Sequence, residues 1–389
     1  MIRILLGSKK YLVLAALLVL CAGGILAWEV NKITQTYGTD AGPALAQALD
    51  ACGWKKRDND YYACLRKEIK PVVQNFGVQK TISAVREFYQ QQVSLEESAR
   101  NVVCHEEAHI ISEVGIDVAE NPEQVFAACT PICGYGCHHG AASALFRKKG
   151  DILEDLSTIC GAIRRKGSSF PGQDGTACYH GIGHGLADFA GRDIVKALTL
   201  CNEVEDIQGK DECATGVFME LFDAPTFNQK HLPLPDDFIG FCKGLPVAKD
   251  VCMRSAGGYE FRRSQDGARA FAVCRSAPSD ISRSCAVGIG SDFHFLFEGN
   301  ADKGVSACMA GKELTAPCIQ GLIISGFVSD RSGSIGIHYC QEVSQSDLQT
   351  SCFQYLGKSA EQLGGPDEHE RVCADAGSGI AACRGRSRP

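Results

Sequence analysis

The chain has 389 residues, of which 45% are hydrophobic and 22% are charged, a composition typical of a folded globular protein. This profile excludes collagen-like and low-complexity classes. The formal net charge is only -7 and no basic stretch is interleaved with aromatic residues, so we expect no nucleic-acid partner. The 21 cysteines point to an oxidising compartment, because structural proteins in reducing compartments rarely carry so many.

An uncharged, mostly apolar run covers residues 11–28, behind a basic stub of residues 1–10. The run is long enough for a transmembrane helix, and the preceding positive charge predicts a cytoplasmic N-terminus. We therefore expect a single-pass anchor in the cell membrane, with the Cys-rich domain periplasmic or extracellular. A signal segment that is cleaved, releasing a secreted protein, is the alternative. Residues 29–40 are expected to form a linker.

From Cys137 onward the cysteines alternate between two roles. One kind opens an apolar segment, most often as C-x-x-G, and the other closes it 21 to 23 residues later, or 29 in the one unit with a proline-bearing insertion. A period of this size indicates a repeat architecture. The opening cysteines are Cys137, Cys178, Cys213, Cys252, Cys285, Cys318 and Cys352, and the closing cysteines are Cys160, Cys201, Cys242, Cys274, Cys308, Cys340 and Cys373.

Short polar gaps separate each closing cysteine from the next opening one, which suggests how the cysteines pair. Without Cys21, which lies in the apolar run, 20 cysteines remain, and an even number permits full pairing. Pairing of the opener with the closer inside one unit is the rival scheme, which the sequence alone does not exclude. The expected pairs are Cys52–Cys64, Cys104–Cys133, Cys129–Cys137, Cys160–Cys178, Cys201–Cys213, Cys242–Cys252, Cys274–Cys285, Cys308–Cys318, Cys340–Cys352 and Cys373–Cys383.

The repeat segments favour helices over strands. Residues 193–201 place their apolar side chains at helical spacing, with Asp193 in the first turn, and no run alternates apolar and polar residues for long. The glycine after each opening cysteine would allow neighbouring helices to approach closely. We predict an all-α fold of disulfide-stapled helical hairpins, stacked as an α-solenoid or a closed α/α array. Its parts are an N-terminal helical region (41–103), the repeat domain (104–383) and a basic tail (384–389).

Six of the ten histidines fall within 80 residues and lie close to cysteines: His105, His109, His138, His139, His180 and His184. Two pairs have the form H-x-x-x-H, which on a helix puts both imidazoles on one face. Later repeats lack these histidines, so the scaffold does not need them. We predict that the six bind a metal, with zinc as the default and copper or iron as alternatives. The other four, His231, His294, His338 and His369, are expected to be structural.

Glycine is abundant around the last histidine pair, where Gly181, Gly183 and Gly185 follow one another at every second position. These glycines lower helix propensity, which weakens the argument that His180 and His184 share a helix face. They would also allow a close approach of backbone to a ligand.

The segment His105-Glu-Glu-Ala-His109 matches HExxH, the zincin signature. This resemblance covers five residues, and the metzincin extension is absent. It implies that the two histidines bind zinc and that Glu106 is the general base acting on the metal-bound water. A third ligand of the glutamate class would be Glu113, Glu120 or Glu123.

Other chemistries have little support. The Cys133-Gly-Tyr-Gly-Cys137-His138 segment is one residue longer than the haem c attachment motif, so no haem is expected. No C-x-x-C occurs, which ranks thiol–disulfide exchange last. The sequence predicts a membrane-anchored, extracytoplasmic metal-binding protein, used either for metal-dependent hydrolysis or for binding without turnover. The alternative is a non-enzymatic scaffold with structural histidines and a protein partner on the repeat surface.

Overall fold

The computed structural model describes residues 40–54, 59–92, 97–130, 132–133, 135–166, 173–222, 237–330 and 332–385. The regular structure within these ranges is entirely helical, as predicted. The expected anchor at residues 11–28, most of the linker, and His231 lie outside the described residues. Among the helices that are described, none has both the length and the apolar character needed to cross a membrane.

The N-terminal region is a group of three helices that packs against the first helix of the repeats. Asp40 caps the first of them by accepting a hydrogen bond from the Gly42 backbone N–H at 3.1 Å. The three helices are α2 (Ala41–Cys52), α3 (Asn59–Phe76) and α4 (Val78–Gln90).

The repeat domain alternates long opening helices with shorter or equal closing helices. Each opening helix packs on the next one along the chain, so together they form one continuous layer. The opening helices are α5 (Glu97–Val118), α7 (Gly136–Lys149), α9 (Gln173–Phe189), α11 (Ile207–Phe222), α13 (Lys249–Ser264), α15 (Ser279–Leu296), α17 (Thr315–Ser329) and α19 (Ser346–Gly364). The closing helices are α6 (Pro122–Ala127), α8 (Leu153–Lys166), α10 (Ile194–Cys201), α12 (Phe238–Gly244), α14 (Gly267–Ser276), α16 (Ala301–Met309), α18 (Ser334–Glu342) and α20 (Pro366–Asp375), followed by the short α21 (Ile380–Cys383).

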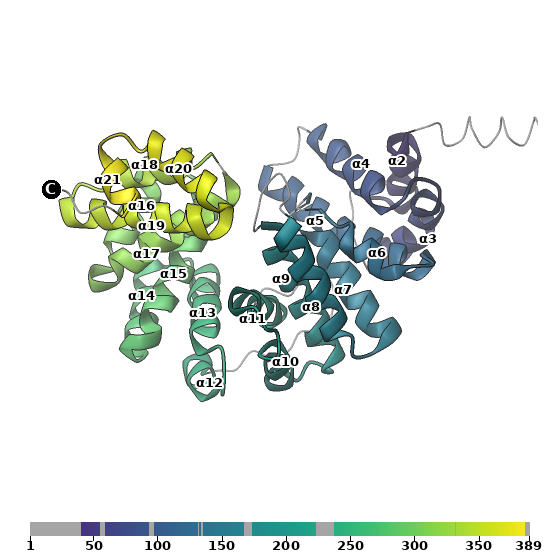
Figure 1. Ribbon diagram of the computed structural model, residues 1–389, viewed down its shortest axis with the longest axis horizontal. Coiled ribbons are helices and arrows are strands. Elements are labelled where there is room, and N and C mark those ends of the chain that lie inside the picture. The colour runs from purple at the N-terminus through teal and green to yellow at the C-terminus, as the bar shows by residue number, and fades with distance from the viewer. Residues whose placement is uncertain are drawn as a thin grey trace, which may run out of the picture.

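The stack follows an open arc. In Figure 1 the chain runs from α2–α4 at one end, along α7–α13 at the bottom, to α18–α21 at the other end. Of the two predicted forms of the array, the open solenoid is therefore observed, and the closed ring is not. At the start of α10, Asp193 lies one residue before the helix as its N-cap, accepting from the Lys196 N–H at 3.0 Å, and not within the first turn.

The disulfides staple this array in the predicted way. All ten expected pairs form, with Cα–Cα separations of 5.1 to 5.6 Å, and the rival pairing within each unit is excluded. Most bonds join the end of a closing helix to the start of the next opening helix, as Cys201–Cys213 joins α10 to α11. Closing loops this short stabilises a fold by about 2–4 kcal/mol per bond.

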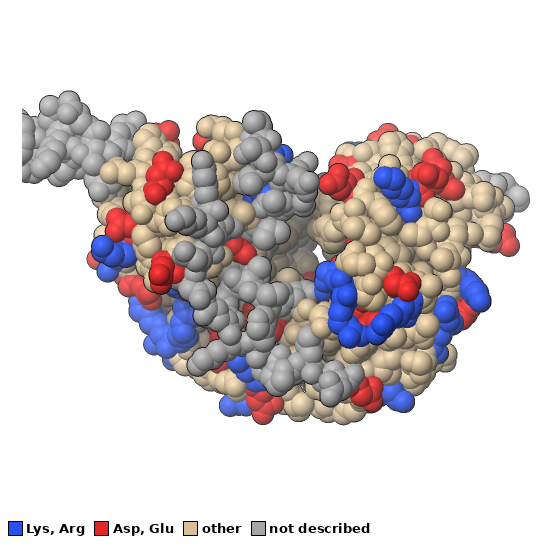
Figure 2. Space-filling model, turned by 180° about the vertical axis from the view of Figure 1, so that it is seen from behind, with Lys and Arg blue, Asp and Glu red and all other residues tan. Residues whose placement is uncertain are grey.

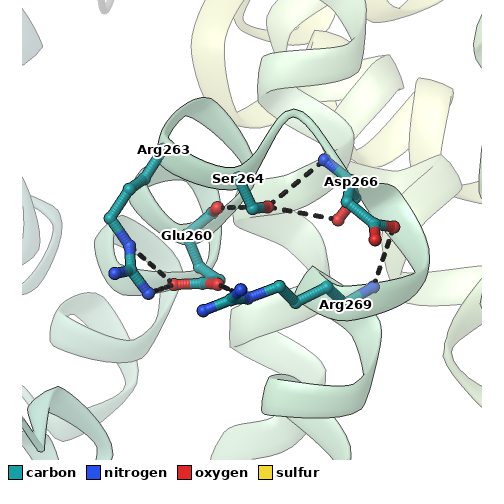
Figure 3. Close-up of polar contacts among 5 residues, drawn as sticks. All are labelled: Glu260, Arg263, Ser264, Asp266 and Arg269. Atoms are coloured by element: carbon teal, nitrogen blue, oxygen red, sulfur yellow. Dashed lines mark hydrogen bonds and ion pairs between the residues drawn. The ribbon is translucent and has the colours of Figure 1, made fainter.

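One buried charge lies at the junction of α13 and α14. Glu260 is fully buried, and its carboxylate accepts from Arg263 Nη2 at 2.5 Å and from Arg269 Nε at 2.8 Å (Figure 3). Beside it, Ser264 and Asp266 hold the turn between the helices, and Asp266 Oδ1 accepts from the Arg269 backbone N–H at 3.1 Å. The ion pairs offset the cost of burying the carboxylate and fix α14 against α13.

Surface charge is mixed. On the face shown in Figure 2, Lys and Arg side chains are interspersed with Asp and Glu side chains and do not gather into one patch. This pattern agrees with the small net charge of the chain.

Candidate metal centre

Five of the six clustered histidines meet between three consecutive opening helices. Neighbouring rings in this five-histidine cluster have centroids 4.2 to 5.0 Å apart. Because each H-x-x-x-H pair lies on one helix face, as predicted, both of its rings point the same way. The members are His105 and His109 from α5, His139 from α7, and His180 and His184 from α9.

The first group consists of His105, His109 and His139. The Nε2 atom of His109 lies 3.2 Å from His105 Nε2 and 3.1 Å from His139 Nδ1. Zinc–imidazole bonds of about 2.0–2.1 Å in a tetrahedron place ligand nitrogens about 3.3–3.4 Å apart. Both distances from His109 Nε2 are therefore close to the spacing of ligands on one ion, and all three ligand atoms lie within 4.8 Å of one another.

The second group consists of His139, His180 and His184, with ligand atoms within 4.8 Å of one another. The Nε2 atoms of His180 and His184 lie 3.2 Å apart. The His139 ring stacks on the His184 ring, with centroids 4.2 Å apart and an interplanar angle of 29°. His139 thus belongs to both groups, and its buried Nε2 has no hydrogen-bond partner in the part of the chain that the structure describes.

Hydrogen bonds outside the cluster orient its outermost rings. His105 Nδ1 lies 3.0 Å from the carbonyl oxygen of Cys133, and His184 Nδ1 lies 2.6 Å from Glu220 Oε1. Both partners are acceptors, so each Nδ1 carries the proton and each Nε2 directs its lone pair into the cluster. Metal-binding histidines are commonly held by such partners, which fix the tautomer and the ring plane.

Electrostatics keep the central rings neutral. Burial, and then the neighbouring imidazoles, hold the pKa values of His109 and His139 well below the ordinary value. Neutral imidazole is the form that binds a metal. For Glu220, burial opposes ionisation, but the hydrogen bond from His184 and nearby positive charge outweigh it and lower the pKa of the carboxyl.

Glycines bring the histidine-bearing helices into contact. A Cβ added at Gly136 would lie 2.3 Å from the carbonyl oxygen of His105, and one at Gly140 would lie 2.1 Å from that of His109. Only glycine permits α7 to rest on these turns of α5. The glycine-rich segment of α9 acts in the same way, because a Cβ at Gly181 would lie 2.7 Å from the carbonyl oxygen of His138. The helix α9 is continuous through these glycines, so packing overrides their low propensity.

The structure separates His138 from the cluster, which corrects the expectation that all six histidines share the site. One position along α7 from His139, its ring lies against Phe126 with centroids 5.6 Å apart. Neither ring nitrogen has a hydrogen-bond partner among the described residues. Burial lowers the pKa of His138 to about 3, so the ring is neutral. Adjacent helix positions point about 100° apart, which is why the two rings diverge.

Glu106, the expected general base, is buried in the structure but belongs to neither group. Its Oε2 accepts a hydrogen bond from the Tyr62 hydroxyl of α3 at 2.8 Å. The neighbouring carboxylate of Glu107 accepts from Tyr89 at 2.5 Å and also from Tyr61. These contacts tie the acidic pair of α5 to the N-terminal helices.

No glutamate of the three third-ligand candidates joins the histidines. Glu113 is bound by Arg66 and by Arg147, and Glu123 by Lys149. Glu120 is likewise in neither group. The resemblance to HExxH predicted a glutamate as the third member beside His105 and His109. In the structure the third member of this group is His139.

The cysteines beside the histidines are not available as ligands. Cys104 pairs with Cys133, and Cys129 pairs with Cys137. A sulfur in a disulfide offers neither a thiolate to a metal nor a thiol for haem attachment. These bonds instead secure the ends of α5 and α7 next to the site.

Sequence reasoning overlooked two residues of α11 that contact the cluster. The carboxylate of Glu220 accepts a hydrogen bond from His184, and the sulfur of Met219 lies 3.1 Å from His180 Nε2. A signal for Met219 exists in the repeat frame. His184 is the sixth residue after its opening cysteine, Cys178, and Met219 is the sixth residue after Cys213.

Comparison of the chain with protein-family models, with curated proteins and with solved structures gives no match.

Proposed function

We propose that this protein binds transition-metal ions through the five-histidine cluster. The observation that carries the proposal is the convergence of three imidazoles. One nitrogen of His105 and one of His139 lie within 3.2 Å of His109 Nε2. A site made of imidazoles, without carboxylate oxygens, suits zinc and other late transition metals and not magnesium or calcium. Zinc is the ion we assign to the first group.

The ten disulfides indicate an oxidising, extracytoplasmic environment. We place the metal site there, on a chain held at the membrane by residues 11–28. Carbonate extraction of membranes tests the anchor: the intact chain should stay in the pellet. Release into the supernatant of a chain shortened at its N-terminus would instead show a cleaved signal segment.

Metal analysis of the purified full-length protein tests the binding proposal. After loading with zinc and removal of the excess, the wild type should retain zinc, and His139→Ala should retain the least because His139 belongs to both groups. His338→Ala is the matched control, since His338 is an exposed histidine far along the chain on α18. A wild type that holds no more zinc than His139→Ala would overturn the proposal and favour the scaffold with structural histidines.

Hydrolysis is the second candidate, favoured by the three-histidine composition of the first group. Catalytic zinc sites commonly have three protein ligands and an open fourth position, and Glu106 follows His105 directly. Glu106→Gln should abolish any hydrolysis of ester or peptide substrates while leaving the zinc content unchanged. Equal rates in the two proteins would show that Glu106 is structural, as its contact with Tyr62 suggests.

A further inference from the structure

A sulfur atom lies at the edge of the five-histidine cluster. Met219, on α11, places its Sδ 3.1 Å from His180 Nε2. The same nitrogen lies 3.2 Å from His184 Nε2. One imidazole nitrogen and one thioether sulfur thus lie next to His180 Nε2, with α9 supplying both nitrogens and α11 the sulfur.

We propose that His180, His184 and Met219 form a copper(I) site, which we call the sulfur site, beside the three-histidine first group. This inference rests on the proposed function, because it assigns a metal to one half of the same cluster. The juxtaposition that carries it is the position of Met219 Sδ and His184 Nε2 next to His180 Nε2, at 3.1 and 3.2 Å.

The arrangement matches that of the first group. There, His109 Nε2 is the central donor, with other donors at 3.1 and 3.2 Å. Each set therefore has two donors next to one central imidazole nitrogen, and His139 can serve the first group alone. The cluster then offers two places for ions, which differ in one ligand: an imidazole in the first group and a thioether in the sulfur site.

The difference in that ligand decides the metal. Thioether sulfur is soft and uncharged, and it selects copper(I) over zinc and other harder divalent ions. An all-imidazole set has no such preference and suits zinc. The sulfur site is therefore expected to bind copper(I), and the first group is expected to bind zinc.

The charges around the sulfur site suit a cation. Glu220 Oε1 lies 2.6 Å from His184 Nδ1, and Glu212 Oε2 lies 3.8 Å from His180 Nδ1. The hydrogen bond with Glu220 orients the His184 ring, and both carboxylates compensate the charge of a bound ion. Both carboxylates belong to α11, the helix that supplies Met219, so one helix provides the soft ligand and the outer partners.

Competition for copper(I) tests the site in the zinc-loaded, full-length protein. All variants carry Cys21→Ser, so that no sulfur comes from the one cysteine outside the ten disulfides. Copper(I) is titrated without oxygen against a chromogenic copper(I) chelator. Met219→Leu removes the sulfur at nearly constant volume and should weaken copper(I) binding by about tenfold or more while zinc content stays the same. Met253→Leu, the same change at a buried methionine of α13, is the control and should bind as the parent does.

X-ray absorption gives an independent readout. The copper-loaded parent and Met253→Leu should both show a sulfur neighbour bound to the metal. Met219→Leu should lose this neighbour and show nitrogen neighbours only. Met219→His, which makes the set all-imidazole, should bind additional zinc.

The outcomes separate this inference from the proposed function. The sulfur site is overturned if Met219→Leu and Met253→Leu retain zinc and bind copper(I) equally well. It is also overturned if the copper-loaded parent shows no sulfur neighbour. The zinc-binding proposal stands in both cases. Failure of the parent to bind either metal overturns both.

Discussion

Glu220 accepts a hydrogen bond from His184 at 2.6 Å, so a carboxylate of one repeat orients a candidate metal ligand of the repeat before it. The two residues are 36 positions apart in sequence, and they meet because α11 packs directly on α9. At this contact α9 contributes the imidazole, and α11 contributes the carboxylate that holds it.

Removal of the Glu220 carboxylate should loosen His184. Loss of such an outer partner typically weakens metal binding by about 10- to 100-fold, so Glu220→Ala should lower affinity by this order. The measurement is competition for the metal by a chelator of known affinity. Glu203→Ala is the control, because Glu203 is an exposed glutamate between α10 and α11. Equal affinities in both variants would contradict the orienting role.

Substitution of Gly140 should separate α7 from α5. A Cβ there would lie 2.1 Å from the His109 carbonyl oxygen, and backbone cannot move aside as a flexible side chain can. Overpacking of this kind costs about 1–3 kcal/mol, so Gly140→Ala should lower the free energy of unfolding by that order and reduce zinc retention. Gly244→Ala, at the end of α12 with nothing within 4 Å, should do neither. Chemical denaturation and metal analysis of both variants make the comparison, and an unaffected Gly140→Ala would refute the close contact.

His138 should tolerate an apolar replacement that His139 does not. Both ring nitrogens of His138 are buried and find no hydrogen-bond partner within the described ranges, a cost that an apolar side chain avoids. His138→Leu should therefore keep its zinc and unfold at an equal or higher temperature. His139→Leu should lose zinc. Zinc loss in His138→Leu, with the fold intact by circular dichroism, would return His138 to the set of ligands.

His294 should make stability depend on pH. The buried ring contacts the Tyr339 hydroxyl at 2.8 Å and the Ser329 hydroxyl at 2.9 Å, and burial lowers the pKa of His294. A histidine whose pKa is lowered by folding contributes stability above its unfolded pKa, near 6.5, and that contribution is lost as pH falls toward the folded value. The free energy of unfolding of His294→Gln should accordingly change less with pH below about 6.5 than that of the wild type.

His338→Gln provides the control for that measurement. His338 lies on the same helix as Tyr339 but is exposed, so its replacement should leave the pH profile of the wild type in place. Denaturant unfolding of the three proteins at matched metal content, from pH 7.5 down to 5, gives the slopes. Parallel slopes for the wild type and His294→Gln would show that protonation of His294 does not oppose folding.

The repeat architecture follows from the sequence, and the cysteine spacing favours one set of disulfides over the rival pairing within each unit. Cysteines that recur at fixed spacing can be joined in few consistent ways, and the short gap from Cys201 to Cys213 predicted a bond that the structure contains. The glycine after each opening cysteine predicted close helix contacts for a similarly local reason, since a bulky residue would hold the neighbouring helix away. The i, i+4 spacing of His105 and His109 likewise predicted that their rings share a face.

Which side chains meet depends on the tertiary structure and could not be predicted from local spacing. His138 and His139 are equivalent in sequence terms, but the rotation between adjacent helix positions sends one ring to Phe126 and the other into the cluster. Glu106 fits the HExxH spacing, yet the packing of α3 on α5 places its carboxylate where it accepts a hydrogen bond from Tyr62. Met219 shares the repeat position of His184, but its sulfur reaches His180 only because α11 packs on α9. Local spacing sets the direction of a side chain along its own helix, whereas the partner it faces depends on how separate helices stack.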